Sequence, residues 1–326
     1  MIHAGTHKTA TSYIQNRLWL NSERLQAQGV VYRYPRSRVA KHKPLAKALR
    51  RAQWGLWNRS LRRWGADGQR ILLSAEQFTK PFCHRARFQP LLQLLTRRGY
   101  RLRVVLFLRD QPDYMNARYV YSLRRFYHCL PFDDYVRQQL RRGQATYDYN
   151  SMLSDMLACR NLTLDVLPFR SQAGDPFEQL MDLLGITSPE GWLPADPIRG
   201  NQQPGCRGVW LAQQVGRRLQ AQGKMDGEGI NSSQRLVRRI ADARGWSADR
   251  FYGFSPELAR EVAHHYASAN DHLAQRLWGC SWRDRFPWHL PERRTYELPP
   301  VGDERQAMLA EVEAALEQLQ AYWSQP

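Results

Sequence analysis

The sequence has few cysteines and no long apolar segment. Its five cysteines are scattered along 326 residues and form no Cys-x-x-Cys or Cys/His spacing typical of zinc sites. Their odd number, together with the lack of a signal-peptide pattern, predicts a reducing cytoplasm rather than a disulfide scaffold. No apolar run approaches the ~18 residues of a membrane-spanning helix, and we find no internal repeat or low-complexity linker.

Lysine is also scarce, although the chain is strongly basic. Only six of the 48 basic residues are lysine, so 42 are arginine, and the formal net charge is +18. Arginine binds phosphate, sulfate and carboxylate groups through two parallel hydrogen bonds. The charge therefore predicts an anionic partner, which is a nucleotide, an acidic glycan, a membrane surface or a nucleic acid.

The order of apolar segments predicts an α/β fold. A hydrophobic content of 43% is normal for a globular protein with a real core, and α/β domains often reach this length as one unit. Four apolar segments between helical patterns are interpreted as strands: residues 29–32, 70–76, 101–109 and 162–169. A further strand at Met1 to His3 is shorter than the usual ~5–6 residues, so either it is truncated or the chain starts upstream.

The segment after this first strand predicts an anion-binding turn. We name residues 4–12 the first loop; it leads from a strand into a helix. Gly5 can adopt backbone angles that other residues resist, and Thr9, Thr11 and Ser12 suit a helix N-terminus and offer hydroxyls to phosphate oxygens. Free N–H groups at the start of a helix bind anions, and Lys8 adds a positive charge. The alternative is an ordinary strand-to-helix turn with a surface lysine.

The first loop departs from the Walker pattern and matches another one. A Walker loop places Gly-Lys-Ser/Thr five residues after its first glycine, whereas Lys8 follows Gly5 by three. His3-Ala4-Gly5-Thr6-His7-Lys8-Thr9-Ala10-Thr11-Ser12 closely resembles the phosphosulfate-binding loop of sulfotransferases that use 3′-phosphoadenosine 5′-phosphosulfate (PAPS). Their bacterial form is His-x-Gly-Thr-His-Lys-Thr-Gly-Thr-Thr/Ser. Ala10, where the family usually has glycine, is the departure.

The resemblance extends roughly over residues 2–285. Glu76 ends an apolar strand in a Ser-Ala-Glu sequence that recurs in these enzymes, and a functional role is preferred to the alternative of a carboxylate that interacts with a helix dipole. Arg109 matches the strand-end arginine that grips the 3′-phosphate of PAPS in the family. The family serine eight residues later is Ala117 here, so Asn116 or Arg118 replaces it or the 3′-phosphate is held less tightly.

The resemblance implies a P-loop-like three-layer fold, with a central parallel sheet flanked by helices and a helical C-terminal part. Residues 1–285 would form the α/β domain and residues 286–326 an extension with a terminal helix. Lys8 and Glu76 would be catalytic. Lys8 would contact the bridging oxygen of PAPS, and Glu76 would accept the acceptor's proton, which needs partial burial to raise its pKa. The predicted nucleotide-binding residues are Gly5, Thr6, His7, Lys8, Thr9, Ala10, Thr11, Ser12 and Arg109.

Several questions stay open at this point. His7 and His42 are alternative bases, no metal is required, and the product would be adenosine 3′,5′-bisphosphate (PAP). The acceptor would be a hydroxyl or amine, for example of a glycan or glycolipid. The rival functions are a basic nucleic-acid- or membrane-binding protein without catalysis, and a nucleotide-dependent kinase.

Two peripheral segments also bear on partners. The basic, aromatic residues 49–64 place Trp54, Trp57, Leu61 and Trp64 at helical spacing. Core packing is the preferred interpretation, ahead of a membrane-surface helix or a sugar platform. Near the C-terminus a 3-4-3-4 apolar pattern predicts a helix packed on the domain or on a second subunit of a homodimer. Its residues are Leu309, Val312, Leu316, Leu319 and Trp323.

Overall fold

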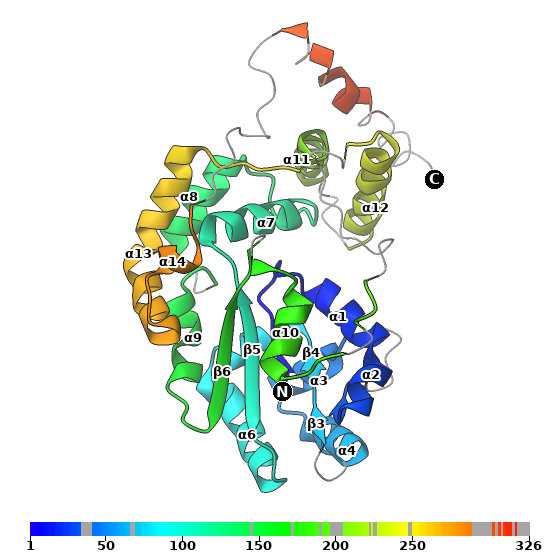
Figure 1. Ribbon diagram of the computed structural model, residues 1–326. Helices are drawn as coiled ribbons and strands as arrows, with labels where there is room; N and C mark the ends of the chain where they lie inside the picture. Colours follow the sequence, from blue (N-terminus) through cyan, green and yellow to red (C-terminus); the bar gives the residue numbers. More distant parts are fainter. Residues whose placement is uncertain are drawn as a thin grey trace. The chain divides into compact units, whose positions relative to one another are not determined.

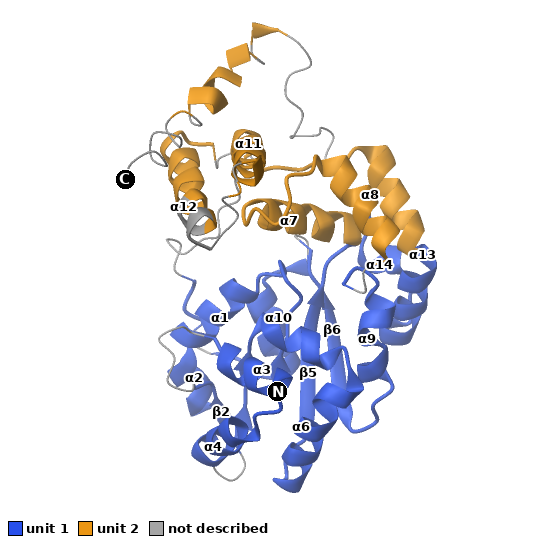
Figure 2. Cartoon of the chain, turned by 180° about the vertical axis from the view of Figure 1, so that it is seen from behind, with its two compact units in different colours: residues 1–110, 145–200, 267–287 blue, residues 111–144, 201–266, 288–326 orange. Residues whose placement is uncertain are grey.

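The computed structural model describes most of the chain, which divides into two compact units (Figures 1 and 2). Unit 1 comprises residues 1–110, 145–200 and 267–287, and unit 2 comprises residues 111–144, 201–266 and 288–326. The residues outside the description are 34–40, 66–68, 144–145, 171–172, 189–190, 196–204, 222, 224–226, 247–249, 289–301, 304–305, 308, 315–316 and 318–326. The predicted division at residue 285 stays a prediction.

Unit 1 is built on parallel strands, which lie within the four apolar segments and the short first strand. One sheet has the order β4-β1-β5-β6 and a second pairs β2 with β3, and every pair is parallel. The strands are β1 (Ile2–His3), β2 (Val30–Val31), β3 (Arg70–Ile71), β4 (Leu73–Ser74), β5 (Leu102–Leu108) and β6 (Leu162–Pro168). The prediction of a central parallel sheet is therefore confirmed.

The two sheets are joined through a single residue. Only Leu72 separates β3 from β4, and its N–H donates to the Val31 carbonyl at 3.0 Å. One extended segment thus pairs with β2 at its start and with β1 at its end. After β1 the next strands of the chain, β2 to β4, lie on the β4 side of β1, whereas β5 and β6 lie on its other side. The strand order therefore reverses at β1. Ligands of open α/β sheets bind outside the carboxyl ends of strands at such a point.

Helices cover this sheet because both faces of its central strand are apolar. Val105 and Phe107 belong to a buried cluster with residues of α1 and α10, while Val104 and Leu106, which alternate with them, are also fully buried. The helices of unit 1 are α1 (Thr11–Leu20), α2 (Ser22–Ala27), α3 (Lys43–Arg50), α4 (Trp54–Trp64), the 3-10 turn η1 (Glu76–Phe78), α5 (Thr79–Phe82), α6 (Arg85–Arg97), α9 (Tyr149–Leu157), α10 (Pro176–Leu184) and α14 (Trp282–Arg285).

A buried arginine fixes α1 against α10. Arg17 Nη1 donates to Asp175 Oδ2 at 2.9 Å, and its guanidinium lies 4.3 Å from the centre of the Phe177 ring. Tyr13 also donates to the Asp175 carboxylate. Asp175 in turn accepts from the first N–H groups of α10. The helix that follows the first loop is therefore held by a buried, paired charge, whose loss would leave Asp175 uncompensated.

The tryptophan-rich helix α4 packs into the core. Trp57, Leu61 and Trp64 are buried, and the Trp57 indole N–H donates to the Leu45 carbonyl at 3.2 Å. This outcome confirms core packing over a sugar platform or membrane-surface helix for these three residues. Among the residues that the structure describes, no helix is long and apolar enough to cross a membrane.

Unit 2 is helical, with an aromatic cluster at its centre. Its helices are α7 (Gln111–Leu123), α8 (Phe132–Arg142), α11 (Cys206–Ala221) and α12 (Gly227–Ala243); α13 (Pro256–Trp278) contributes its first part. Tyr119 stacks on Phe251 and meets the Phe132 ring edge-on, with centroids 5.6 and 5.0 Å apart. Asn116 donates to the Phe251 carbonyl and accepts from the Gly253 N–H.

The described part of the C-terminal segment packs on unit 2. Val312 is buried, and Glu311 accepts from the Trp246 indole at 3.2 Å and pairs with Arg207 at 3.3 Å. The predicted helix thus contacts its own chain at this point. Leu316, Leu319 and Trp323 lie outside the described residues, and the predicted second subunit stays a prediction.

Two buried histidines should make the stability of the protein sensitive to acid. Burial lowers the pKa of His3 and of His42 to about 4, from the ordinary 6.5. Between these values the unfolded chain binds protons that the folded chain does not, so lowering the pH favours unfolding. We expect the free energy of unfolding to fall between pH 7.5 and 5.5, on the order of 1 kcal/mol per buried histidine.

Urea denaturation at constant ionic strength measures this effect. A variant of an exposed histidine, His272→Gln, is the control and should retain the full pH dependence. An unfolding free energy that stays level from pH 7.5 to 5.5 would contradict the argument.

Candidate functional site

The predicted site residues converge on one edge of the sheet. His3, the last residue of β1, pairs with Ser74 of β4 on one side and Val105 of β5 on the other. The first loop leaves β1, Glu76 follows β4, and Arg109 follows β5. Because the three strands are parallel, these residues leave the sheet at the same edge, beside the reversal of strand order.

Gly5 is required for space rather than for unusual backbone angles. We expected it to adopt angles that other residues resist, but its φ is outside the left-handed region. A Cβ atom at this position would lie 2.5 Å from Thr11 Oγ1 and 3.1 Å from His3 Nε2. The close approach of β1, the loop and the start of α1 therefore excludes a side chain here.

The threonine hydroxyls shape the loop. Thr6 Oγ1 donates to the Phe107 carbonyl at 2.8 Å and so ties the loop to β5. Thr9 and Thr11 donate to the Thr6 carbonyl at 2.8 and 3.5 Å. In this conformation both hydroxyls are directed to the Thr6 carbonyl, and the expectation that they donate to phosphate stays a prediction. Ser12, by contrast, is exposed.

Two residues of the first loop have left-handed backbone angles. Lys8 has φ 66° and Ala10 has φ 54°, whereas Thr9 between them has no positive φ. Such alternation turns successive N–H groups toward one side and forms an anion-binding concavity. Ala10 precedes α1, whose N-terminus no side chain caps. The N–H groups in the first turn of a helix have no partner within that helix. Those of α1 therefore add to the N–H groups of the first loop as donors to an anion.

Polar atoms of β1 and α1, the elements that flank the first loop, have no partner among the described residues. His3 Nδ1 is bonded to Ser74 Oγ at 2.8 Å, while Nε2, next to Gly5, is buried without a hydrogen bond. Both amide atoms of Gln15, in α1, are likewise buried and unbonded. Buried polar groups nearly always have a partner, so such exceptions mark functional positions or bound water and ions.

Glu76 is surrounded by positive charge. Its Oε2 lies 3.3 Å from His7 Nδ1, and the Glu76 side chain is 29% exposed. Burial would raise the pKa of this carboxyl, but the hydrogen bond from His7 and the charges of His7, Lys41 and Lys8 outweigh it, so the pKa is lowered. The expected rise in pKa is therefore wrong for the free protein.

Lys41 is a site residue that the sequence reasoning missed. Its Nζ donates to Ser12 Oγ in the first turn of α1 at 3.3 Å, and its charge acts on Glu76. Lysine scarcity was the available signal, because three of the six lysines lie within residues 41–47. Lys41 adds a second ammonium group to the one expected from Lys8.

Arg109 is held in place at the end of β5. The Tyr149 hydroxyl donates to its carbonyl at 2.8 Å, and its guanidinium lies 5.8 Å from the centre of the Phe169 ring. Ala117 is buried in α7. Both amide atoms of Asn116 are engaged within unit 2, which argues against Asn116 as the substitute for the missing family serine.

His42 is a structural residue. It is fully buried, its Nδ1 accepts from the Ser74 N–H at 3.0 Å, and its Nε2 lies 2.7 Å from the Arg33 carbonyl. With both nitrogens bonded, His42 cannot accept a proton from a substrate. His7 and Glu76 are the predicted bases that lie at the first loop.

Comparison of the chain with protein-family models, with curated proteins and with solved structures found no match. Within the described ranges, no group of three or more His, Cys, Asp and Glu side chains could hold a metal ion. The five cysteines, all of them described, form no disulfide.

The left-handed conformation of Ala10 should lower the free energy of unfolding of the protein. A residue with a side chain pays about 1–2 kcal/mol in this conformation, and glycine avoids that cost at an entropic penalty of about 0.5–1 kcal/mol. We expect Ala10→Gly to raise the free energy of unfolding by about 0.5–1 kcal/mol. Chemical denaturation measures it.

Ala52→Gly is the matched control, because Ala52 also has φ 54° but is exposed and follows α3. Both variants should gain similar stability. A loss of stability in Ala10→Gly alone would show that the loop depends on the Ala10 methyl group.

Proposed function

We propose that the protein is a sulfotransferase with a P-loop-like three-layer fold, which moves the sulfuryl group of PAPS to a hydroxyl or amine. The observation that favours it most is the first loop itself. Its N–H groups, the uncapped start of α1, Lys8 and Lys41 provide positive potential at one place, while the chain lacks Walker spacing. The nucleotide, cytoplasmic location and homodimer are part of this proposal.

Different residues would bind different groups of the nucleotide. The first loop, residues 4–12, would hold the 5′-phosphate through its N–H groups and Ser12, with Lys41 beside Ser12. Lys8 would lie at the oxygen that bridges phosphorus and sulfur, where negative charge develops as the bond breaks. Arg109, fixed by Tyr149, would hold the 3′-phosphate.

The reaction needs positioning and charge neutralisation more than covalent help from the protein. The acceptor oxygen or nitrogen bonds to sulfur, the bond from sulfur to the bridging oxygen breaks, and PAP leaves with that electron pair. The acceptor's proton passes to Glu76 or to His7, which are 3.3 Å apart. A nucleotide phosphate that attracts Lys8 and Lys41 would weaken their hold on the carboxylate and make Glu76 a stronger base.

The acceptor is proposed as a carbohydrate or lipid-linked sugar, and peripheral membrane contact would bring the protein to the latter. A basic nucleic-acid- or membrane-binding protein without catalysis is the rival that the net charge of +18 favours. DNA affinity that falls with salt, without any response to PAP, would support that rival.

The nucleotide assignment predicts stabilisation by PAP. A ligand at 100 times its Kd that binds only the folded state stabilises it by about 2.7 kcal/mol. PAP should therefore raise the melting temperature, and Lys8→Ala and Arg109→Ala should reduce the shift. Equal protection by ATP with an unchanged response in Arg109→Ala would overturn the 3′-phosphate assignment.

A comparison of Lys41→Ala with Lys43→Ala tests whether Lys41 contributes specifically to PAP binding. Removal of a charge-assisted hydrogen bond should cost about 1.5–3 kcal/mol, so Lys41→Ala should weaken PAP binding by about tenfold or more in calorimetry. Lys43→Ala removes an exposed lysine two residues away and should have little effect. Equal losses in the two variants would indicate diffuse electrostatics instead.

Glu76→Gln separates binding from proton transfer. The variant should retain PAP binding, because it removes a negative charge that competes for Lys8 and Lys41. Turnover should fall by about 10²–10⁴-fold, the usual contribution of a positioned base. If turnover stays near normal while His7→Ala abolishes it with PAP still bound, the base is His7.

A further inference from the structure

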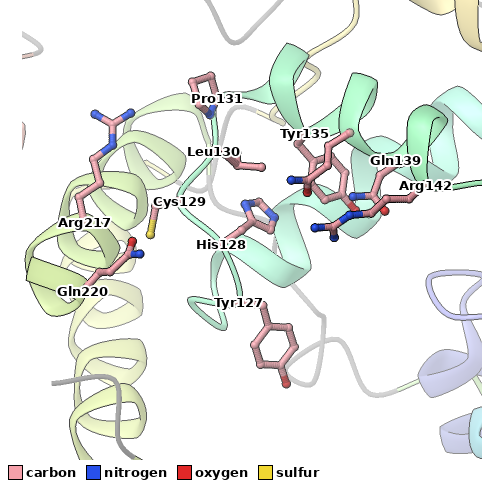
Figure 3. Close-up of a pocket in the computed structure, with 11 residues that line it drawn as sticks. Tyr127, His128, Cys129, Leu130, Pro131, Tyr135, Gln139, Arg142, Arg217 and Gln220 are labelled. Carbon is pink, nitrogen blue, oxygen red and sulfur yellow. The ribbon is translucent and has the colours of Figure 1, made fainter. Parts of the chain in front are cut away.

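Unit 2 contains a pocket that the proposed function does not use. It has a volume of about 580 Å³ and lies between the loop after α7, helix α8 and helix α11 (Figure 3). Small-molecule sites commonly have volumes of about 300–1,000 Å³. The lining is rich in amides and cations: Gln138, Gln139 and Gln220 line it with Arg142 and Arg217, and no lining residue is acidic.

One amide that lines the pocket has no partner among the described residues. Gln139 is 5% exposed, and within the described part of the chain no hydrogen bond is formed by its amide. An amide both donates and accepts hydrogen bonds, as the hydroxyl groups of a sugar do. On the same lining, His128 Nδ1 is a buried atom without a hydrogen bond among the described residues. Because buried polar groups are rarely left unbonded, this nitrogen indicates a polar ligand in the pocket.

The aromatic residues of the pocket are compatible with a saccharide. His128 and Tyr135 stack on each other with centroids 4.7 Å apart, which leaves no slot for a base between them. The Tyr127 ring, by contrast, is 70% exposed at the pocket and offers an apolar face to the C–H groups of a sugar ring. Burial lowers the pKa of His128 to about 4, so that its ring is neutral at pH 7.

The charge of the pocket specifies the kind of saccharide. Among the described residues, no carboxylate forms an ion pair with Arg142 or Arg217, so both guanidinium groups are available to an anionic group. Guanidinium binds carboxylate and sulfate through two parallel hydrogen bonds. We propose that this pocket binds a saccharide that bears a carboxylate or a sulfate group. This inference stands independently of sulfuryl transfer by unit 1.

Calorimetry with three oligosaccharides tests the proposal. A hyaluronan tetrasaccharide has carboxylates alone, a chondroitin sulfate tetrasaccharide has both groups, and chitotetraose is neutral. At least one acidic tetrasaccharide should bind, and chitotetraose should bind at least tenfold more weakly. Preference between the two acidic probes distinguishes carboxylate from sulfate. Absence of binding by all three, or equal binding of the neutral probe, would overturn the proposal.

Variants of the lining residues test whether the saccharide binds in this pocket or is attracted by the overall positive charge of the protein. Arg142→Ala and Arg217→Ala should each weaken the acidic probe by about tenfold, and Tyr127→Ala, a change at an exposed ring, should weaken it several-fold. Arg141→Ala removes the adjacent exposed arginine of α8 and is the matched control. Equal weakening by Arg141→Ala would overturn the pocket as the site, as would displacement of the tetrasaccharide by stoichiometric PAP. Melting temperatures confirm that each variant is folded.

Discussion

The candidate site depends on the position of β1 between β4 and β5. This strand has only two residues, yet the hydrogen bonding between strands continues past its end. The Ala4 N–H donates to the Val105 carbonyl, and the Ala75 N–H donates to the His3 carbonyl. Thr6 then bonds to Phe107. Since parallel strands share one carboxyl edge, this pairing brings the first loop, Glu76 and Arg109 to the same edge of the sheet.

Positive charge and backbone strain meet at that edge. Lys8 and Ala10 hold conformations that side chains disfavour, and threonine hydroxyls pointing inward stabilise the turn. Strain of this kind persists where surrounding contacts impose it and is found most often at ligand sites. In the free protein Glu76 balances the charges of Lys8, Lys41 and His7. An anion at the first loop would compete for the same charges and would thereby make Glu76 a stronger base.

The two units offer different chemistry. The edge of unit 1 combines backbone N–H groups, lysines and a carboxylate, which suits a phosphate group and a proton transfer. The pocket of unit 2 combines amides, arginines and an exposed tyrosine without an acidic residue, which suits recognition of an anionic, hydroxyl-rich ligand.

The sequence alone indicated the strands, the first loop, Glu76 and Arg109, because apolar runs and strand-to-helix turns are local patterns. The central parallel sheet was implied by the family resemblance of the first loop. The sequence also indicated core packing for Trp57 and Trp64. Only the tertiary structure decided the role of Gly5, the inward direction of the threonine hydroxyls, the lowered pKa of Glu76 and the burial of His42. Each of these depends on atoms from segments distant in sequence, such as Lys41 beside Ser12, whose proximity no local pattern encodes.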